Sequence, residues 1–120
     1  MGWPHRLFGG RVADVGAAEV IGLERGGALL LDVRERPELH AGHAPGARHV
    51  PLGQLDGRLD SLPTNRRLVV VCRSGSRSRR ATALLLRSGF DAVNLNGGML
   101  AWAAAGLPVE TDSGGPGRVA

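Results

Sequence analysis

Two short apolar runs stand out along the chain, at residues 28–33 and 68–72, with Asp32 as the one charged interruption. Runs of this length without polar alternation are typical of β-strands that are buried on both faces of a parallel sheet. Further strands are predicted at residues 90–95, 11–13 and 47–50, the last of these at an edge of the sheet. The pattern therefore predicts five short strands.

Between the strands, apolar residues recur every three or four positions, which predicts amphipathic helices. The first helix follows Asp14 as its N-cap and ends at the glycine pair 26–27. Another begins at Ser78 as its N-cap and ends at Gly89. Shorter helices are predicted at about residues 52–62 and at 99–105, and residues 34–40 form a loop or a short helical turn. The alternation of strands and helices predicts an α/β fold, with a parallel sheet covered on both faces.

The 120 residues are enough for a single domain. We expect an irregular lead-in at residues 1–10 and a folded domain at 11–110. Residues 111–120 hold three glycines, a proline and little apolar content, which predicts a mobile tail. Hydrophobic residues make up 42% of the chain and aromatic residues 3%, so the core must consist mainly of Leu, Val and Ala.

All fifteen basic residues are arginines, which excludes chemistry that needs a lysine, such as a Schiff base or a Walker-type phosphate site. Seven of the arginines fall within residues 61–90, where no acidic residue occurs. A nucleic-acid surface and a merely solvated face are alternatives. Because this segment also holds the only cysteine and few aromatics, a local positive field for small anions is the preferred interpretation.

The chain contains one cysteine, which excludes an intramolecular disulfide framework. No apolar run approaches the roughly 18–20 residues that cross a bilayer, and the first ten residues lack the apolar stretch of a secretory signal. A free thiol without an export signal predicts a reducing, cytoplasmic location and no membrane partner.

The cysteine lies between the strand at 68–72 and the following helix, a position that favours an ionised, nucleophilic thiol. Backbone N–H groups of residues 73–78 can converge there on an anion, and the helix dipole adds positive charge. These effects should lower the pKa of Cys72 and populate the nucleophilic thiolate. The residues expected to bind an anionic substrate are Arg73, Ser74, Gly75, Ser76, Arg77 and Ser78. The alternative is an inert buried cysteine, which would not need such a polar loop.

Three blocks of sequence together resemble the rhodanese family, in its single-domain form. The first contains Leu31–Asp32–Val33–Arg34–Glu35, Glu38, the turn at residues 42–47 and Val50–Pro51. The second is the six-residue loop that follows Cys72. The third contains Gly89–Phe90, Leu95, Gly97–Gly98–Met99, Trp102 and residues 106–109. The resemblance spans about residues 11–110, although Leu39 and Ala44 depart from the aromatic and larger aliphatic residues usual in the family.

The resemblance implies a three-layer fold with a five-stranded parallel sheet flanked by helices. It also implies transfer of a sulfane sulfur from a donor such as thiosulfate to cyanide or a thiol, through a persulfide on Cys72. A cysteine desulfurase or a sulfur-accepting protein is a possible partner, and no cofactor is expected. One alternative is a persulfide carrier or protein-interaction module with incidental thiosulfate activity.

The other alternative is a cysteine phosphatase or arsenate reductase. A phosphatase loop has five residues between its cysteine and arginine, whereas four separate Cys72 from Arg77. The smaller ring should suit a sulfur anion better than a phosphate.

Two further charged residues, Asp32 and Arg34, lie at the carboxyl end of a predicted strand, where α/β sheets place their ligands. They could border the site, or they could form a structural ion pair. His40 and His43 have a spacing that metal ligands can show, but no cysteine or carboxylate set supports them. No metal site is therefore predicted.

Overall fold

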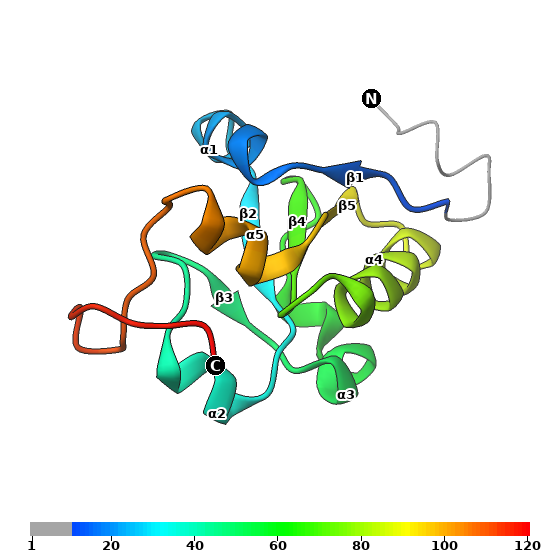
Figure 1. The fold of residues 1–120 in the computed structure, drawn as a ribbon. Coiled ribbons are helices and arrows are strands. Elements are labelled where there is room, and N and C mark those ends of the chain that lie inside the picture. Colours follow the sequence, from blue (N-terminus) through cyan, green and yellow to red (C-terminus); the bar gives the residue numbers. More distant parts are fainter. Residues whose placement is uncertain (1–10) are drawn as a thin grey trace.

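The computed structural model describes residues 11–120 and shows strands alternating with helices along the chain (Figure 1). The strands are β1 (Asp14–Val15), β2 (Leu29–Asp32), β3 (Arg48–His49), β4 (Leu68–Val71) and β5 (Ala92–Leu95). The helices are α1 (Ala17–Arg25), α2 (Arg36–Ala41), α3 (Leu52–Leu55), α4 (Ser76–Arg87) and α5 (Gly98–Ala104), with a 3₁₀ helix, η2, at Asp56–Ser61. The predicted lead-in at residues 1–10 lies outside the described residues.

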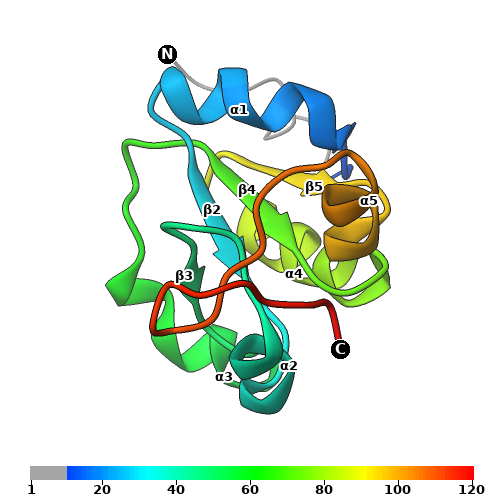
Figure 2. The same cartoon turned by 60° about the vertical axis from the view of Figure 1, so that its left-hand side comes forward.

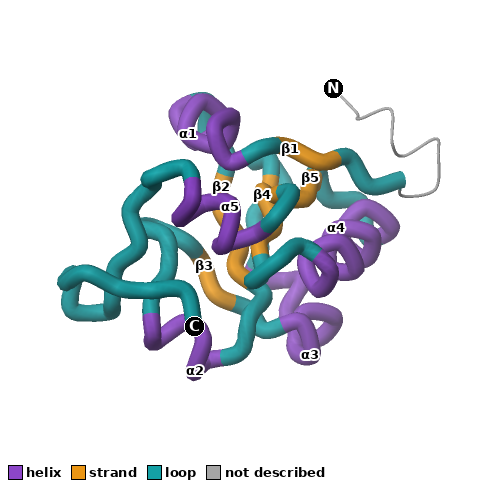
Figure 3. Tube along the Cα trace, in the orientation of Figure 1, coloured by secondary structure: helices purple, strands orange, loops and turns teal. Residues whose placement is uncertain are grey.

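The five strands form one parallel sheet in the order β1-β5-β4-β2-β3. The predicted α/β class and the five-stranded parallel sheet are confirmed, and β3 lies at an edge as expected. The sheet is flanked by helices on both sides (Figure 3). No helix among residues 11–120 is long and apolar enough to cross a membrane.

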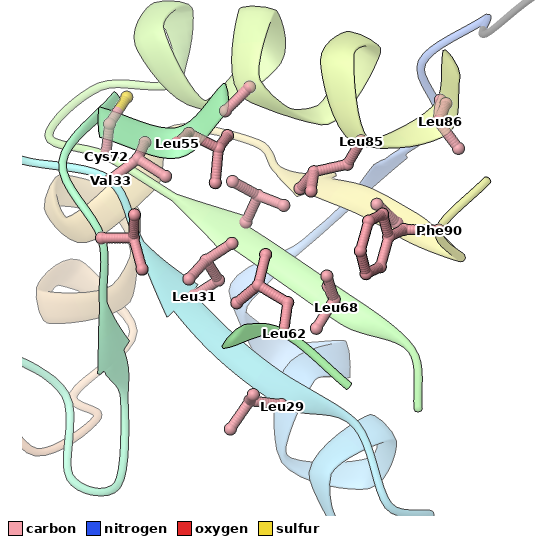
Figure 4. Close-up of a cluster of buried hydrophobic side chains, with 14 residues drawn as sticks. Leu29, Leu31, Val33, Leu55, Leu62, Leu68, Cys72, Leu85, Leu86 and Phe90 are labelled. Carbon is pink, nitrogen blue, oxygen red and sulfur yellow. The ribbon is translucent and has the colours of Figure 1, made fainter. Parts of the chain in front are cut away.

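Side chains of the central strand β4 alternate between two hydrophobic clusters, as the pleat of a strand requires. Leu68 and Val70 join the cluster beneath α3, η2 and α4, whereas Val69 and Val71 join the cluster beneath α1 and α5. Cys72 continues this alternation into the first cluster. Figure 4 shows the cysteine at one end of that cluster, near Val33 and Leu55.

The structure corrects the predicted start of the chain's first two elements. The first strand covers Asp14–Val15 instead of residues 11–13, and Asp14 is not an N-cap. Gly16 caps α1, and its N–H donates to the Glu19 carboxylate at 2.9 Å. Asp14 was a reasonable cap by residue type, but its position beside β5 places it in the sheet.

Two helix boundaries also differ from the prediction. The helix expected at 52–62 is split into α3 and η2, with non-helical backbone angles at Arg58. The helix after Cys72 begins at Ser76 rather than after Ser78, and Gly75 is its N-cap with a φ of 115°. Since only glycine adopts such an angle readily, the turn into α4 is closed by Gly75, which brings the helix start closer to the cysteine.

The segment after residue 110, for which the sequence predicts a mobile tail, folds back over the molecule in the structure. Glu110 pairs with His43 through two backbone hydrogen bonds of 2.9 Å, and the Arg118 N–H donates to the Ala41 carbonyl at 2.9 Å. The segment passes α2 (Figure 2), and the carbonyl of its last residue, Ala120, accepts a hydrogen bond of 2.8 Å from Arg73. Any motion of this segment would have to break those bonds.

Candidate active site

Cys72 follows the last residue of β4, at the carboxyl end of a strand that lies between β5 and β2. Ligands bind at this edge in open parallel sheets, because the loops that leave the strands gather there. The residue is only 1% exposed. The thiol therefore sits in the protein interior, at the point where the sheet gives way to the loop.

The loop after Cys72 is held by the start of α5. The N–H groups of Met99 and Leu100 donate to the carbonyls of Cys72 and Arg73, at 2.8 and 3.1 Å. Gly98 lies so close to these carbonyls that a Cβ would be 2.6 Å from the backbone carbon of Arg73. With its first two carbonyls turned toward α5, the loop presents N–H groups to the sulfur, and the Gly75 N–H lies 3.1 Å from it.

The pKa of Cys72 is lowered by this arrangement, as the sequence predicts. Burial by itself would raise the pKa of the thiol. Hydrogen bonds from the Ser78 hydroxyl and from the N–H groups of Ser78, Gly75 and Ser74 outweigh that effect. The loop therefore favours the thiolate, the form that acts as a nucleophile.

Arg77 lies in the first turn of α4 and is paired with a carboxylate from another helix. Its two terminal nitrogens donate to the two Glu38 oxygens at 2.7 and 2.8 Å. The hydrogen bond to Arg77 holds the pKa of Glu38 down at about 2, and the same contact raises the pKa of Arg77. An anion that binds Arg77 must therefore share it with Glu38.

The remaining loop residues differ in exposure. Arg73 is exposed, and its Nε donates to the Ala120 carbonyl at 2.8 Å, so the C-terminal segment contacts the loop. Ser74 and Ser76 are exposed and Ser78 is buried. The Ser78 hydroxyl donates to Asn94 Oδ1 at 2.6 Å.

Asp32 and Arg34 form a fully buried ion pair, with 2.8 Å between Arg34 Nη2 and Asp32 Oδ2. The same Nη2 also donates to the Gly42 carbonyl at 2.8 Å. Nη1 lies 3.4 Å from the Glu38 carbonyl. These contacts attach the end of β2 to the first turn of α2, which carries Glu38, and to its C-cap Gly42, and none of them reaches the cysteine loop.

His40 and His43 both contact the side chain of Asp112. Each imidazole contacts a different oxygen of Asp112, at 2.9 and 3.0 Å. Within residues 11–120, no group of three or more His, Cys, Asp or Glu side chains is arranged so that it could hold a metal ion. The histidines instead connect α2 and the following turn to the C-terminal segment.

Three residues of this arrangement were not singled out as site residues from the sequence. Glu38 is there only part of a motif, Asn94 is not mentioned, and Asp14, whose Oδ1 accepts a hydrogen bond of 3.0 Å from Asn94 Nδ2, is predicted only as a helix cap. A polar residue inside the apolar strand β5 is the one signal that could have drawn attention to Asn94. Nothing in the local pattern could have paired Glu38 with Arg77, because the two are 39 positions apart.

The fold and the site together define a class: α/β proteins with a thiol at the start of an N–H-lined loop between a central strand and a helix. The family model of the rhodanese-like domain matches the sequence at residues 18–105. The chain belongs to this family.

Individual relatives agree with the assignment. A sulfurtransferase of Allochromatium vinosum is 40% identical over 87 residues, which cover 72% of this chain and 81% of the relative. The crystal structure of a rhodanese-related protein from Thermoplasma volcanium has a TM-score of 0.76 at 29% identity and covers 81% of this chain and 96% of its own. A thiosulfate sulfurtransferase from Pseudomonas aeruginosa has a TM-score of 0.76 at 28% identity. It covers 98% of this chain, which spans 24% of that larger protein.

Proposed function

We propose that this protein is a sulfurtransferase in which Cys72 carries a sulfane sulfur as a persulfide. The observation that carries the proposal is the Cys72 thiol, placed 3.1 Å from the Gly75 N–H in a loop that lowers its pKa. The sulfurtransferase relatives support the same chemistry.

In the first step, the Cys72 thiolate attacks the outer sulfur of a donor such as thiosulfate. A bond forms between the two sulfurs, the bond between the outer sulfur and the sulfonate breaks, and sulfite leaves with the electron pair. Cys72 is left as a persulfide anion. Loop N–H groups stabilise the negative charge on the terminal sulfur because they are already oriented toward it.

In the second step, an acceptor attacks the terminal sulfur of the persulfide. Cyanide leaves as thiocyanate, or a thiol leaves as a persulfide, and the Cys72 thiolate is restored. The chain holds no second cysteine, so the acceptor must be external. The two steps are separate, which predicts ping-pong kinetics.

The loop residues have different parts in this scheme. Ser74, Gly75 and Ser78 supply the N–H groups that face the sulfur. Arg77, Arg73 and the exposed Ser76 supply positive charge and hydrogen bonds for an anionic donor. Asp32 and Arg34 do not contact the substrate in this scheme. They hold α2 in place, so that Glu38 on this helix stays paired with Arg77.

Intact-mass spectrometry tests the proposal directly. Incubation with thiosulfate should add the mass of one sulfur atom, and cyanide should remove it. The matched control is Cys72→Ala, which should gain no sulfur. A folded wild-type protein that gains no sulfur from thiosulfate or from a cysteine desulfurase would contradict the proposal.

The rates of persulfide loading and of turnover separate the carrier alternative from the enzyme. Rapid loading by a cysteine desulfurase, combined with slow turnover of thiosulfate and cyanide, would favour a persulfide carrier in a reducing cytoplasm. An assay with an aryl phosphate examines the phosphatase alternative, for which we expect no hydrolysis above the Cys72→Ala background.

A further inference from the structure

The C-terminal segment, residues 111–120, lies against the end of α2 and the turn that follows. The Arg118 N–H donates to the Ala41 carbonyl at 2.9 Å. Gly117 packs directly on Gly42, so that a Cβ on Gly117 would stand 2.8 Å from the Gly42 Cα. A Cβ on Gly42 would in turn lie 2.6 Å from the backbone nitrogen of Arg118. The two stretches of chain therefore touch backbone to backbone, which requires glycine at both positions.

The end of this segment reaches the cysteine loop. Val119 packs against the hydrophobic cluster beneath α1 and α5, and the Ala120 carbonyl accepts a hydrogen bond of 2.8 Å from Arg73 Nε. Arg73 directly follows Cys72 and is one of the two arginines assigned above to an anionic donor. A guanidinium binds an oxyanion best through two parallel N–H groups on one edge. The carbonyl occupies the edge that contains Nε, so an anion has to displace it in order to bind there.

Nearer its start, the segment is held by an imidazole that has two acceptor partners. His43 Nε2 lies 3.0 Å from Asp112 Oδ1, and His43 Nδ1 lies 3.2 Å from the Ala44 carbonyl oxygen. A carbonyl oxygen and an ionised carboxylate only accept, whereas a neutral imidazole carries a single N–H. Both hydrogen bonds therefore form only when His43 is the doubly protonated imidazolium. His40 contacts Asp112 through Nδ1 alone, at 2.9 Å, which a neutral ring can also do.

We propose that the C-terminal segment is a pH-sensitive latch, which protonated His43 holds through Asp112 and which, when held, keeps Arg73 from binding the anionic sulfur donor. Because the held form needs the additional proton, the latch is favoured at low pH and is released as the pH rises through the range in which histidine titrates. The inference concerns regulation of the proposed donor site and so rests on the proposed function.

The other titratable groups around this contact are consistent with that sign. Hydrogen bonds from His43 and His40 hold the pKa of Asp112 below its ordinary value, so this carboxylate is ionised when the histidines titrate. Protonation of His40 adds to the same attraction. The His49 ring also titrates, but its Nε2 contacts the Arg34 carbonyl at 2.6 Å and not the segment. The remaining charged groups on the neighbouring elements are carboxylates and guanidiniums, which as classes titrate far from neutral pH: Asp32, Arg34, Arg36, Glu38, Glu110 and Arg118.

The test compares the alkylation of Cys72 by iodoacetate, which is an anion, with its alkylation by neutral iodoacetamide. Both reagents need the thiolate, so the ratio of the two rates cancels the ionisation of the thiol and reports how readily the site receives an anion. We expect this ratio to rise about threefold from about pH 5.5 to about pH 8, as the latch releases Arg73. The loss of charge from His40 and His43 would by itself lower the ratio, so a rise cannot come from the local charge alone.

Two glycines of the segment provide a matched pair of variants. Gly117→Ala places a Cβ against Gly42 and should release the latch at every pH, which predicts a high ratio without pH dependence. Gly115→Ala is the control, because its Cβ would meet no atom closer than Thr111 Oγ1 at 3.7 Å. We expect this control to keep the pH dependence of the wild type.

A double-mutant cycle shows whether the effect passes through Arg73. In the Arg73→Met background, Gly117→Ala should no longer change the ratio. Hydrogen exchange of the Arg118 amide, corrected for its intrinsic pH dependence, measures docking itself. Its protection should decrease as the pH rises and should be lost in Gly117→Ala.

A ratio that falls when the segment is released would mean that the segment positions Arg73 for anions. An unchanged ratio would mean that the segment has no influence on the site, and either result overturns the proposal. If Gly117→Ala does not fold, Asp112→Asn decides, since that side chain is 57% exposed and its replacement does not disturb the core. This variant should also give a raised ratio without pH dependence, and a wild-type profile would overturn the proposal.

These outcomes are distinguishable from a failure of the proposed function, because alkylation needs no sulfur transfer. A protein whose Cys72 gains no sulfur from any donor could still show the expected ratios. Conversely, normal persulfide formation with a ratio that does not respond to pH or to Gly117→Ala would reject only the latch.

Discussion

Two carboxylate–arginine pairs involve α2 or the residues just before it, and they differ in burial and in what they connect. The pair Asp32–Arg34 is fully buried, with 0% exposure of both side chains, and holds β2 to α2. The pair Glu38–Arg77 has side-chain exposures of 21% and 30% and joins α2 to the cysteine loop. The two pairs have similar chemistry, so they differ in burial and in the elements that they connect.

The physical reason lies in desolvation. A buried pair has lost its water and cannot exchange partners without a large cost in free energy. A partly exposed pair keeps water at its edge, so a dissolved anion can compete for the arginine at low cost. Of these two pairs, only the second therefore has an arginine that a dissolved anion could reach, which supports its proposed role in binding the donor.

The largest effect is expected from breaking the buried pair. Arg34→Met leaves Asp32 as an unpaired buried charge and removes the hydrogen bonds to the Glu38 and Gly42 carbonyls. It should lower the free energy of unfolding by about 3–5 kcal/mol. Chemical denaturation followed by circular dichroism measures this. The control is the double variant Asp32→Leu with Arg34→Met, which should recover part of the loss. A single variant as stable as the wild type would mean that the two pairs do not differ as argued.

Arg77→Met should lower the activity but should change the stability little. Removing the charge that faces an anionic donor should reduce kcat/KM for thiosulfate by at least about tenfold, while the unfolding free energy changes by about 1 kcal/mol or less. Steady-state kinetics and denaturation provide the two readouts. Glu38→Gln is the matched variant, because it leaves Arg77 charged but without its ionised partner. Equal activity losses from Glu38→Gln and Arg77→Met would point to loop geometry instead of donor charge.

The smallest effect concerns acid stability. The pKa of Glu38 is about 2 in the folded protein, against an ordinary value of 4.5. Because the folded value is the lower one, the carboxylate stabilises the protein above pH 4.5, and this contribution is lost as the pH falls toward 2. After allowance for solvent screening, we expect about 1 kcal/mol.

Denaturation at pH values between neutrality and 2.5 checks this expectation. The difference in stability between the wild type and Glu38→Gln should shrink across the acid range. A constant difference would indicate that Glu38 makes no ionised contact with Arg77 in solution.

Much of the fold follows from local patterns. The apolar runs at β2 and β4 marked the central strands, because a strand covered on both faces needs apolar residues on both. The glycine pair at 26–27 marked the end of α1. The boundaries that failed, at Asp14 and Ser78, involve residues that make good caps in isolation but have partners elsewhere in the fold. Both side chains form hydrogen bonds with Asn94.

For the candidate site too, some features could be predicted from the sequence and others could not. The sequence by itself determined that Cys72 begins a short, glycine-containing, arginine-rich loop between a strand and a helix, since all of these features lie within ten consecutive residues. Only the tertiary structure decided which groups surround that loop. The order of the sheet places β1 beside β5, which brings Asp14 to Asn94 across 80 positions. The packing of α2 against the loop brings Glu38 to Arg77. Contacts between distant residues depend on how the elements pack, and no local pattern of residues encodes that packing.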